Sequence, residues 1–282
     1  MAYAVINHIK KLKIHYLSDI HLEFYDITKI PRILQQIVPQ SPICVLAGDI
    51  GYPFQSTYEV FLRGIHSKFE HIFLIHGNHE YYQLKNNKGK SNEEIVEKTR
   101  EIIETHNLHK IHFLHNSHYD LPNSTLDPNG SEGSRESSNF RFIGSILWSK
   151  IEDKRYLSND YELIYTNGVD QLNETHELCK DYIQNALIEA KNEDKKVIMI
   201  THHLPSFKLN HPKYAKYLNY HQCFSSHSDD LINEPVKLWI FGHTHMDINM
   251  KINDVCCVAN PIGYKGEKLN PNFNRVVEVS DD

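Results

Sequence analysis

The chain has 282 residues, of which 40% are hydrophobic and 11% aromatic, so it can bury a substantial core in one large domain or two small ones. Its formal net charge of −6, from 30 basic and 36 acidic residues, argues against an extended surface for nucleic acid or anionic lipid. No apolar stretch approaches the roughly 20 residues that span a bilayer, and the N-terminus lacks a signal-peptide pattern, so we expect a soluble protein.

The five cysteines bear on the compartment. Cys44, Cys179, Cys223, Cys256 and Cys257 form an odd set without the C-x-x-C spacing that is typical of a metal site. Reduced thiols are the simplest interpretation of such a set. We therefore expect a cytoplasmic protein.

Strand-like apolar runs alternate with helix-like stretches along the chain. The runs lie within residues 13–21, 43–49, 71–80, 196–203 and 238–245. The helix-like stretches are 28–37, 56–67, 92–105 and 168–190. This alternation predicts an α/β fold. Further strands are expected in "NFRFIGSILWS" (139–149) and at "VCCVA" (255–259).

The stretch 168–190 illustrates the helix prediction. Its apolar residues recur at helical spacing and most of its charged residues fall elsewhere, as in an amphipathic surface helix. His176 lies among the recurring residues. We therefore interpret His176 as part of a packed helix face and not as a member of a functional site.

Two segments are assigned neither to a helix nor to a strand. Residues 120–139 are rich in Ser, Asn, Gly and Pro, which predicts an exposed, mobile loop inserted into a single domain that spans residues 1–282. Residues 204–230 interleave tyrosines with lysines and show no clean periodicity. This segment is either a lid that contacts the substrate or an ordinary surface excursion, and both interpretations stay open.

Polar residues that can bind metal follow each of the five strand-like runs. They are Asp19 and His21, Asp49, Asn78 and His79, His202 and His203, and His243 and His245. The carboxyl ends of strands in an open α/β sheet face one crevice, so these residues are expected to converge. Carboxylate and imidazole ligands together favour manganese, iron or zinc. Asp49 is the candidate to bridge two such ions, which in pairs lie roughly 3.5 to 4 Å apart.

These motifs resemble those of the calcineurin-like metallophosphoesterases. They comprise D-x-H at Asp19 and His21, G-D at 48–49, G-N-H-E at 77–80, the histidine of "THH", and G-H-x-H at 242–245. A G-H-x-H pair alone does not distinguish metal ligands from strand-end histidines. Here five motifs occur in the family's order, and the chain further resembles a subgroup of small single-domain members described as predicted phosphoesterases or phosphatases.

The resemblance implies a centre with two divalent transition-metal ions, either manganese, iron or zinc. One ion would be held by Asp19, His21 and His245, and the other by Asn78, His202 and His243, with Asp49 as the bridge. We place His202 and not His203 in the ligand set because it is the first histidine after the apolar run. A shift by one residue stays open.

The resemblance also implies a reaction and a fold. A metal-bridging hydroxide would attack phosphorus in a phosphate ester, and His79 would assist departure of the leaving group. The fold would be a four-layer α-β-β-α sandwich, in which two mixed β-sheets pack face to face and helices flank them. Periodicity alone would not distinguish this sandwich from a single doubly wound sheet.

Several alternatives are weighed against particular residues. Ser/Thr protein phosphatases follow their G-D with D-R-G, whereas Asp49 is followed here by "IGYPFQ". Purple acid phosphatases have G-D-x-x-Y, which Tyr52 matches, but their first motif lacks a histidine equivalent to His21. A nuclease, a cyclic nucleotide phosphodiesterase and a catalytically silent protein-binding module also stay open. Loss of catalysis should leave gaps among the ligands, and the sequence has none.

The residues that contact the substrate are predicted less firmly by the motifs than the metal ligands are. Tyr82, His203 and Asn260 are expected to line the crevice, and Glu80 is expected to orient neighbouring groups. The expected partner is a small phosphate ester or a phosphorylated substrate. The choice between mono- and diester and the oligomeric state are left open.

Overall fold

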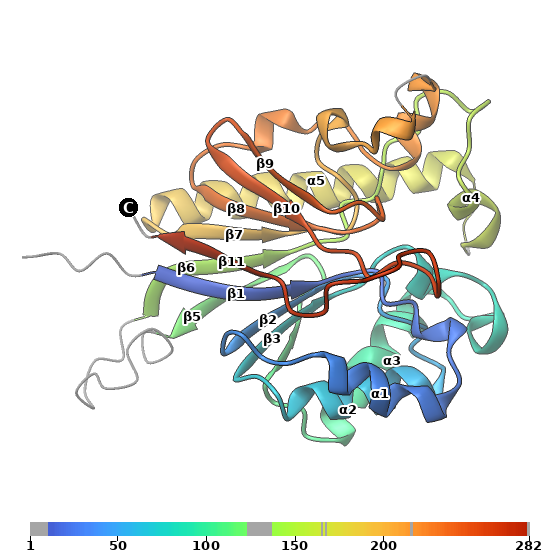
Figure 1. Ribbon diagram of the computed structural model, residues 1–282. Coiled ribbons are helices and arrows are strands. Elements are labelled where there is room, and N and C mark those ends of the chain that lie inside the picture. The colour runs from blue at the N-terminus through green and yellow to red at the C-terminus, as the bar shows by residue number, and fades with distance from the viewer. Residues whose placement is uncertain (1–10, 123–136, 165, 167, 215–216, 281–282) are drawn as a thin grey trace, which may run out of the picture.

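The computed structural model describes residues 11–122, 137–164, 166, 168–214 and 217–280, and these form two β-sheets with helices on both outer faces (Figure 1). The first sheet has the order β11-β1-β2-β3-β4, and the second has the order β5-β6-β7-β8-β10-β9. Each sheet is mixed, because β11, β5 and β9 pair antiparallel with their neighbours while the other pairs are parallel.

The strands of the first sheet are β1 (Lys11–Leu17), β2 (Ile43–Ala47), β3 (His71–Ile75), β4 (Ile111–Phe113) and β11 (Val276–Ser280). Those of the second are β5 (Ser117–Pro122), β6 (Ser137–Gly144), β7 (Lys196–Ile200), β8 (Val236–Phe241), β9 (Ile248–Ile252) and β10 (Val255–Ala259). The α-helices are α1 (Ile30–Gln36), α2 (Ser56–His66), α3 (Asn92–Thr105), α4 (Asn159–Leu163) and α5 (Val169–Asn192).

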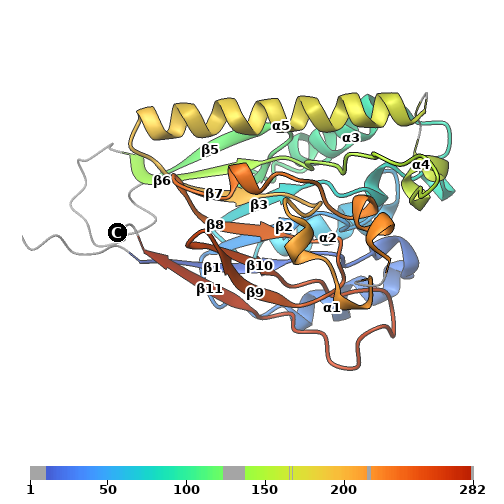
Figure 2. The same ribbon diagram turned by 90° about the horizontal axis from the view of Figure 1, so that it is seen from above.

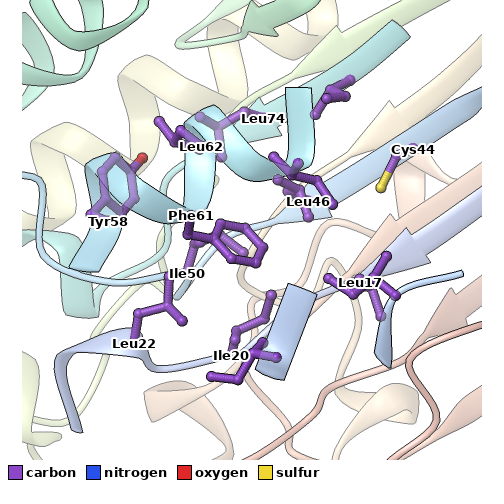
Figure 3. Packing of buried hydrophobic residues seen from close by; sticks show 14 of the residues in the cluster. Leu17, Ile20, Leu22, Cys44, Leu46, Ile50, Tyr58, Phe61, Leu62 and Leu74 are labelled. Carbon is purple, nitrogen blue, oxygen red and sulfur yellow. The ribbon is translucent and has the colours of Figure 1, made fainter. Parts of the chain in front are cut away.

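Strand β2 shows why a continuous apolar run becomes a central strand. Every residue of "ICVLA" is buried, because alternate side chains point to opposite faces of the sheet and both faces are covered. Cys44 and Leu46 point to the same side of the sheet and belong to one buried cluster with Phe61 and Leu62 of α2 (Figure 3). Burying a side chain such as Phe61 contributes about 1.5–3 kcal/mol to stability.

The second sheet is covered by α5 on its outer face. The buried side of this helix, which includes Ile183, Ala186 and Leu187, packs against residues of β7 and β8 such as Met199 and Trp239. Figure 2 shows that α5 runs along nearly the whole molecule, which its 24 residues allow. His176 is buried on the same helix, and its Nδ1 donates to the Leu147 carbonyl, so it is a packing residue as expected.

A third apolar layer joins the two sheets face to face. Phe73 of β3 stacks on Phe142 of β6 with ring centroids 3.8 Å apart, and Val45, Ile198 and Ile240 belong to the same buried cluster. The order of layers is therefore helix, sheet, sheet, helix. The predicted α-β-β-α sandwich is confirmed, and the alternative of a single doubly wound sheet is wrong.

Some element boundaries differ from the predictions. Residues 120–122 end β5 and residues 137–139 begin β6, so the expected loop at 120–139 is shorter at both ends. Antiparallel pairing of β5 with β6 extends to Pro122 and Ser137. The intervening residues 123–136 lie outside the described residues. The strand expected over 139–149 ends at Gly144, after which the chain leaves the sheet.

The segment 204–230 is built from short 3-10 helices joined by turns. These helices are Phe207–Leu209, Pro212–Tyr214, Leu218–Cys223 and Asp229–Leu231, and residues 215–216 lie outside the described part. Within the described residues, no helix combines the length and the apolar character that a bilayer crossing requires.

Candidate metal centre

The predicted ligands converge at the carboxyl ends of five parallel strands, which run toward the same end of the molecule (Figure 1). We call Asp19, His21 and His245 the first ligand group, and Asn78, His202 and His243 the second ligand group. Ligand atoms of the first group lie within 4.8 Å of one another. The same limit holds for Asp49 with His202 and His243.

Most of these ligands share an unusual backbone conformation. Asp19, His21, Asp49, His243 and His245 all have positive φ angles, between 50° and 67°. This left-handed region is uncommon for residues other than glycine, although Asp and His enter it more readily than most, and each instance costs about 1–3 kcal/mol. The clustering of residues in this conformation is typical of a functional site.

Two glycines of the motifs are required by close packing under the site. A Cβ atom on Gly48, whose φ is +84°, would lie 2.5 Å from Nδ1 of His202. A Cβ atom on Gly77 would lie 2.2 Å from Oδ1 of Asp49. Any larger residue would displace a ligand, which gives the glycines of G-D and G-N-H-E a steric reason.

In the first ligand group, carboxylates hold both imidazoles. Nδ1 of His21 lies 3.0 Å from Oε1 of Glu23, and Nδ1 of His245 lies 2.6 Å from Oε2 of Glu267. The Nε2 atoms of the two rings are 3.1 Å apart, and Nε2 of His245 is 3.4 Å from Oδ1 of Asp19. Burial by itself would raise the pKa of Asp19, but His245 reverses that effect and lowers the pKa to about 2.

This geometry fits a cation. When Nδ1 of each ring donates its proton to a carboxylate, Nε2 of the neutral ring has a lone pair and no proton. The lone pairs of His21 and His245 then face each other and the Asp19 carboxylate at short distance. Either a metal ion or a second ring proton can satisfy these atoms. Burial lowers the pKa of His245, but Asp19 and Glu267 outweigh burial and raise the pKa to about 9. The donor set suits manganese, iron or zinc.

In the second ligand group, a backbone carbonyl holds each imidazole. Nδ1 of His202 donates to the Ala47 carbonyl at 2.9 Å, and Nε2 of His243 is 3.2 Å from the Cys223 carbonyl. Nε2 of His202 lies 3.3 Å from Oδ2 of Asp49, and in the neutral ring it would present a lone pair to a metal ion. That Asp49 oxygen is also 4.0 Å from Nε2 of His21, so it lies between the two ligand groups.

Asn78 is oriented by a residue from a distant element. Its Nδ2 donates to Oδ1 of Asp160 at 2.8 Å and to the Tyr82 hydroxyl at 3.0 Å. The Tyr82 hydroxyl in turn donates to the same Asp160 oxygen at 2.8 Å. With the amide nitrogen engaged, Oδ1 of Asn78 faces Nε2 of His202 at 2.9 Å. In the neutral ring both atoms are acceptors, so a metal ion could bind between them.

Glu80 connects the loops that follow β2 and β3. Its carboxylate accepts hydrogen bonds from the backbone N–H groups of Gly77 at 2.7 Å, Ile50 at 2.7 Å and Asp49 at 3.1 Å. The residue is fully buried. Glu80 therefore positions the backbone that presents Asp49 and Asn78, as expected for an orienting group.

His79 lies beside the ligands with one nitrogen toward the cavity. Its Nδ1 is 2.9 Å from Oε1 of Glu23, and its Nε2 is 3.1 Å from the Tyr264 hydroxyl and 4.0 Å from Oδ2 of Asp49. Burial lowers the pKa of His79, but Asp49 and Glu23 outweigh burial and raise the pKa above its usual value. His79 is therefore suited to hold a proton next to a phosphate oxygen.

A cavity of about 320 Å³ opens above the ligands. Asp49, Asn78, His79, His243 and His245 form its floor, and Tyr82 lines it as expected. The segment 204–230 contributes Lys213, Tyr220, Cys223 and Phe224 to the wall. Whether this segment moves as a lid stays a prediction.

The other two expected lining residues lie elsewhere. His203 is buried behind the floor, where its ring stacks on His243 and its Nδ1 pairs with the Ser149 hydroxyl at 2.7 Å. Asn260 is buried and donates from Nδ2 to the Tyr16 and Asn272 carbonyls. Neither residue lines the cavity, so their contact with substrate stays a prediction without support from its geometry.

Four residues of the site were missed by the sequence interpretation. They are Glu23, Asp160, Tyr264 and Glu267, which contact predicted site residues. Glu23 had a local signal, because it stands two residues after His21. Asp160 comes from α4, and Tyr264 and Glu267 come from the turn after β10; all three are remote in sequence from the motifs, and no periodicity or motif distinguished them.

The model of the calcineurin-like phosphoesterase family matches residues 12–247. The chain belongs to this family. Among curated proteins, this phosphoesterase is 30% identical over 292 residues to the uncharacterized protein L509 of Acanthamoeba polyphaga mimivirus, with 94% of this chain and 96% of that protein covered.

The family fold recurs among solved structures. The phosphopantetheinyl hydrolase PptH from Mycobacterium tuberculosis superposes with a TM-score of 0.66 at 13% identity, covering 95% of this phosphoesterase and 96% of that chain. The protein TT1561 of Thermus thermophilus gives a TM-score of 0.52 at 13% identity, covering 89% of each chain. These likenesses show the same fold, and the family match supports a metal-dependent phosphoesterase.

Proposed function

We propose that this phosphoesterase hydrolyses a small phosphate ester at a centre of two divalent transition-metal ions. The observation that supports this most strongly is the convergence of imidazole, amide and carboxylate lone pairs at the strand ends. Asp19, His21 and His245 would hold one ion, and Asn78, His202 and His243 would hold the other. Asp49 would contact both, because its Oδ2 lies between the two groups.

The ions, when bound, would supply Lewis acidity toward the phosphate oxygens and lower the pKa of a water molecule. The protein contributes position and proton transfer. Asp49 accepts the backbone N–H of His79 at 2.8 Å, which holds the imidazole next to the ligand groups. Nε2 of His79 would then donate a proton to the departing alkoxide, with Tyr264 beside it.

The cavity favours a small substrate. Its volume of about 320 Å³ is at the lower end of the range for ligand pockets in proteins. Tyr82, Tyr220 and Tyr264 offer aromatic surface in its wall, and Lys213 offers a positive charge for phosphate. These features support a phosphomonoester or a small diester over a nucleic acid strand.

A metal-by-substrate screen tests the proposal. The metal-free protein is loaded with manganese, iron, zinc or magnesium and offered an aryl monophosphate, an aryl diester, a cyclic nucleotide, a phosphopantetheine ester and a phosphopeptide. We expect turnover of at least one ester with a transition metal, and its loss on chelation. Binding of metal without turnover of any ester would instead favour the catalytically silent module.

A further inference from the structure

One buried carboxylate, Glu23, contacts both a proposed metal ligand and the proposed proton donor. Its Oε1 lies 3.0 Å from Nδ1 of His21 and 2.9 Å from Nδ1 of His79. Glu23 is fully buried in a short 3-10 helix (Leu22–Phe24) that starts directly after His21. The two imidazoles meet edge to face, with ring centroids 4.5 Å apart. A single oxygen atom thus receives two ring N–H groups.

These contacts decide which nitrogen of each ring is available. Because a carboxylate oxygen only accepts, Nδ1 of both rings must be the protonated donor. Nε2 of His21 is then left for the first ligand group, and Nε2 of His79 is left for the cavity beside Tyr264. Rotation of either ring would break a bond to a buried charge, which is costly in the interior.

The charge of Glu23 also needs compensation. Its other oxygen, Oε2, has no hydrogen-bond partner among the described residues, so the two imidazoles are the main groups that stabilise the buried negative charge. A cation on His21 and a proton on His79 would each be attracted to this carboxylate. The shared contact therefore links metal binding to proton donation.

We infer that Glu23 is a positioning residue that acts on metal ligand His21 and on leaving-group histidine His79 at the same time. This inference rests on the proposed function of these two histidines. Glu267 offers a comparison, because it holds His245 by a carboxylate–imidazole contact but has no hydrogen bond to His79 in the described structure. It reaches His79 only indirectly, by accepting the backbone N–H of Tyr264, whose hydroxyl lies beside Nε2 of His79. Substitution of Glu23 and substitution of Glu267 should therefore have different effects.

The experiment compares Glu23→Ala, Glu23→Gln, Glu267→Ala and His79→Asn. Manganese affinity is measured by calorimetry without substrate, and kcat is measured at saturating metal with aryl phosphates whose leaving groups differ in pKa. We expect Glu23→Ala and Glu267→Ala each to weaken metal binding by about 10- to 100-fold. His79→Asn should leave metal affinity close to that of the unmodified protein.

The dependence of kcat on the pKa of the leaving group distinguishes a role in proton donation from a role in metal binding alone. Loss of a proton donor slows poor leaving groups by about 10²- to 10⁴-fold and good ones much less. We expect this steeper dependence for His79→Asn and for Glu23→Ala but not for Glu267→Ala. Glu23→Gln should recover part of both properties, because its amide oxygen can still accept from the rings.

One outcome would contradict the shared role of Glu23, and another would contradict the proposed role of His79. If Glu23→Ala weakens metal binding but keeps the original leaving-group dependence while His79→Asn changes it, the shared role of Glu23 is wrong. If His79→Asn itself shows the original dependence, the proposed role of His79 fails instead. Circular dichroism and thermal melts of each variant verify that the fold is retained before either conclusion is drawn.

Discussion

The two ligand groups differ in the hydrogen-bond partners of their imidazoles. In the first group, Glu23 and Glu267 accept the Nδ1 protons of His21 and His245. In the second, the backbone carbonyls of Ala47 and Cys223 contact the rings of His202 and His243. A carboxylate partner increases ligand basicity more than a neutral carbonyl and adds negative charge near the ion. From this difference we predict that two neighbouring groups with similar ligands hold metal ions with unequal affinity.

The largest effect is expected at the residue between the groups. Asp49→Asn removes the charge that both groups share, and we expect kcat for an aryl phosphate to fall by about 10³-fold or more, which corresponds to roughly 4 kcal/mol of lost transition-state stabilisation. Metal content and rate are measured together. Retention of both ions and of hydrolysis would contradict the bridging role of Asp49.

Removing one ligand from each group tests whether the two groups differ in metal affinity. His202→Ala should keep about one ion per chain at chelator concentrations that strip His245→Ala, because the first group that remains has carboxylate-supported imidazoles. The difference in affinity should be about 10- to 100-fold. Metal content is measured after dialysis against graded chelator. Equal loss from both variants would show that the carboxylates do not distinguish the sites.

A smaller and one-sided effect is expected at Asp160. Asp160→Ala removes the acceptor that orients the Asn78 amide, so the affinity of the second group should fall by about tenfold while the first group is unchanged. Asp160→Asn is the matched control, since its amide oxygen can still accept from Nδ2 of Asn78. Equal losses at both groups would mean that Asp160 acts on the whole centre.

The smallest effect is expected in the cavity wall, at a residue that belongs to neither group. Lys213→Ala removes an exposed positive charge, and such charges contribute about 0.2–1 kcal/mol, so KM should rise by roughly 1.5- to fivefold with kcat unchanged. The change should shrink at high salt. A lower kcat at unchanged KM would instead place this segment in the chemical step or in a motion that limits it.

Much of the site was predictable because its ligands follow strands. The alternation of buried strands and helices predicted an α/β fold, and the family resemblance of the motifs narrowed it to the sandwich. The residues just beyond the strands predicted Asp19, His21, Asp49, Asn78 and the histidine pairs. Parallel strands bring such positions together whatever their separation in the chain. The roles assigned to these residues remain predictions that the experiments above address.

The wall of the cavity and the supports of the ligands were not predictable in the same way. Asp160 lies in a five-residue helix, and Glu267 lies in a turn after β10, so neither belongs to a periodic pattern. His203 and Asn260 stood next to informative motifs, yet the fold turns them away from the cavity. Short irregular segments are placed by tertiary contacts and not by local preference.

The sequence by itself determined the kinds of ligand atoms, their order and the edge of the sheets at which they meet. Only the tertiary structure decided which nitrogen of each histidine faces the centre, because that depends on the partner of the other nitrogen. Those partners, such as Glu23, Glu267 and the Ala47 carbonyl, come from separate loops and strands. The unequal support of the two ligand groups is therefore a property of the folded chain.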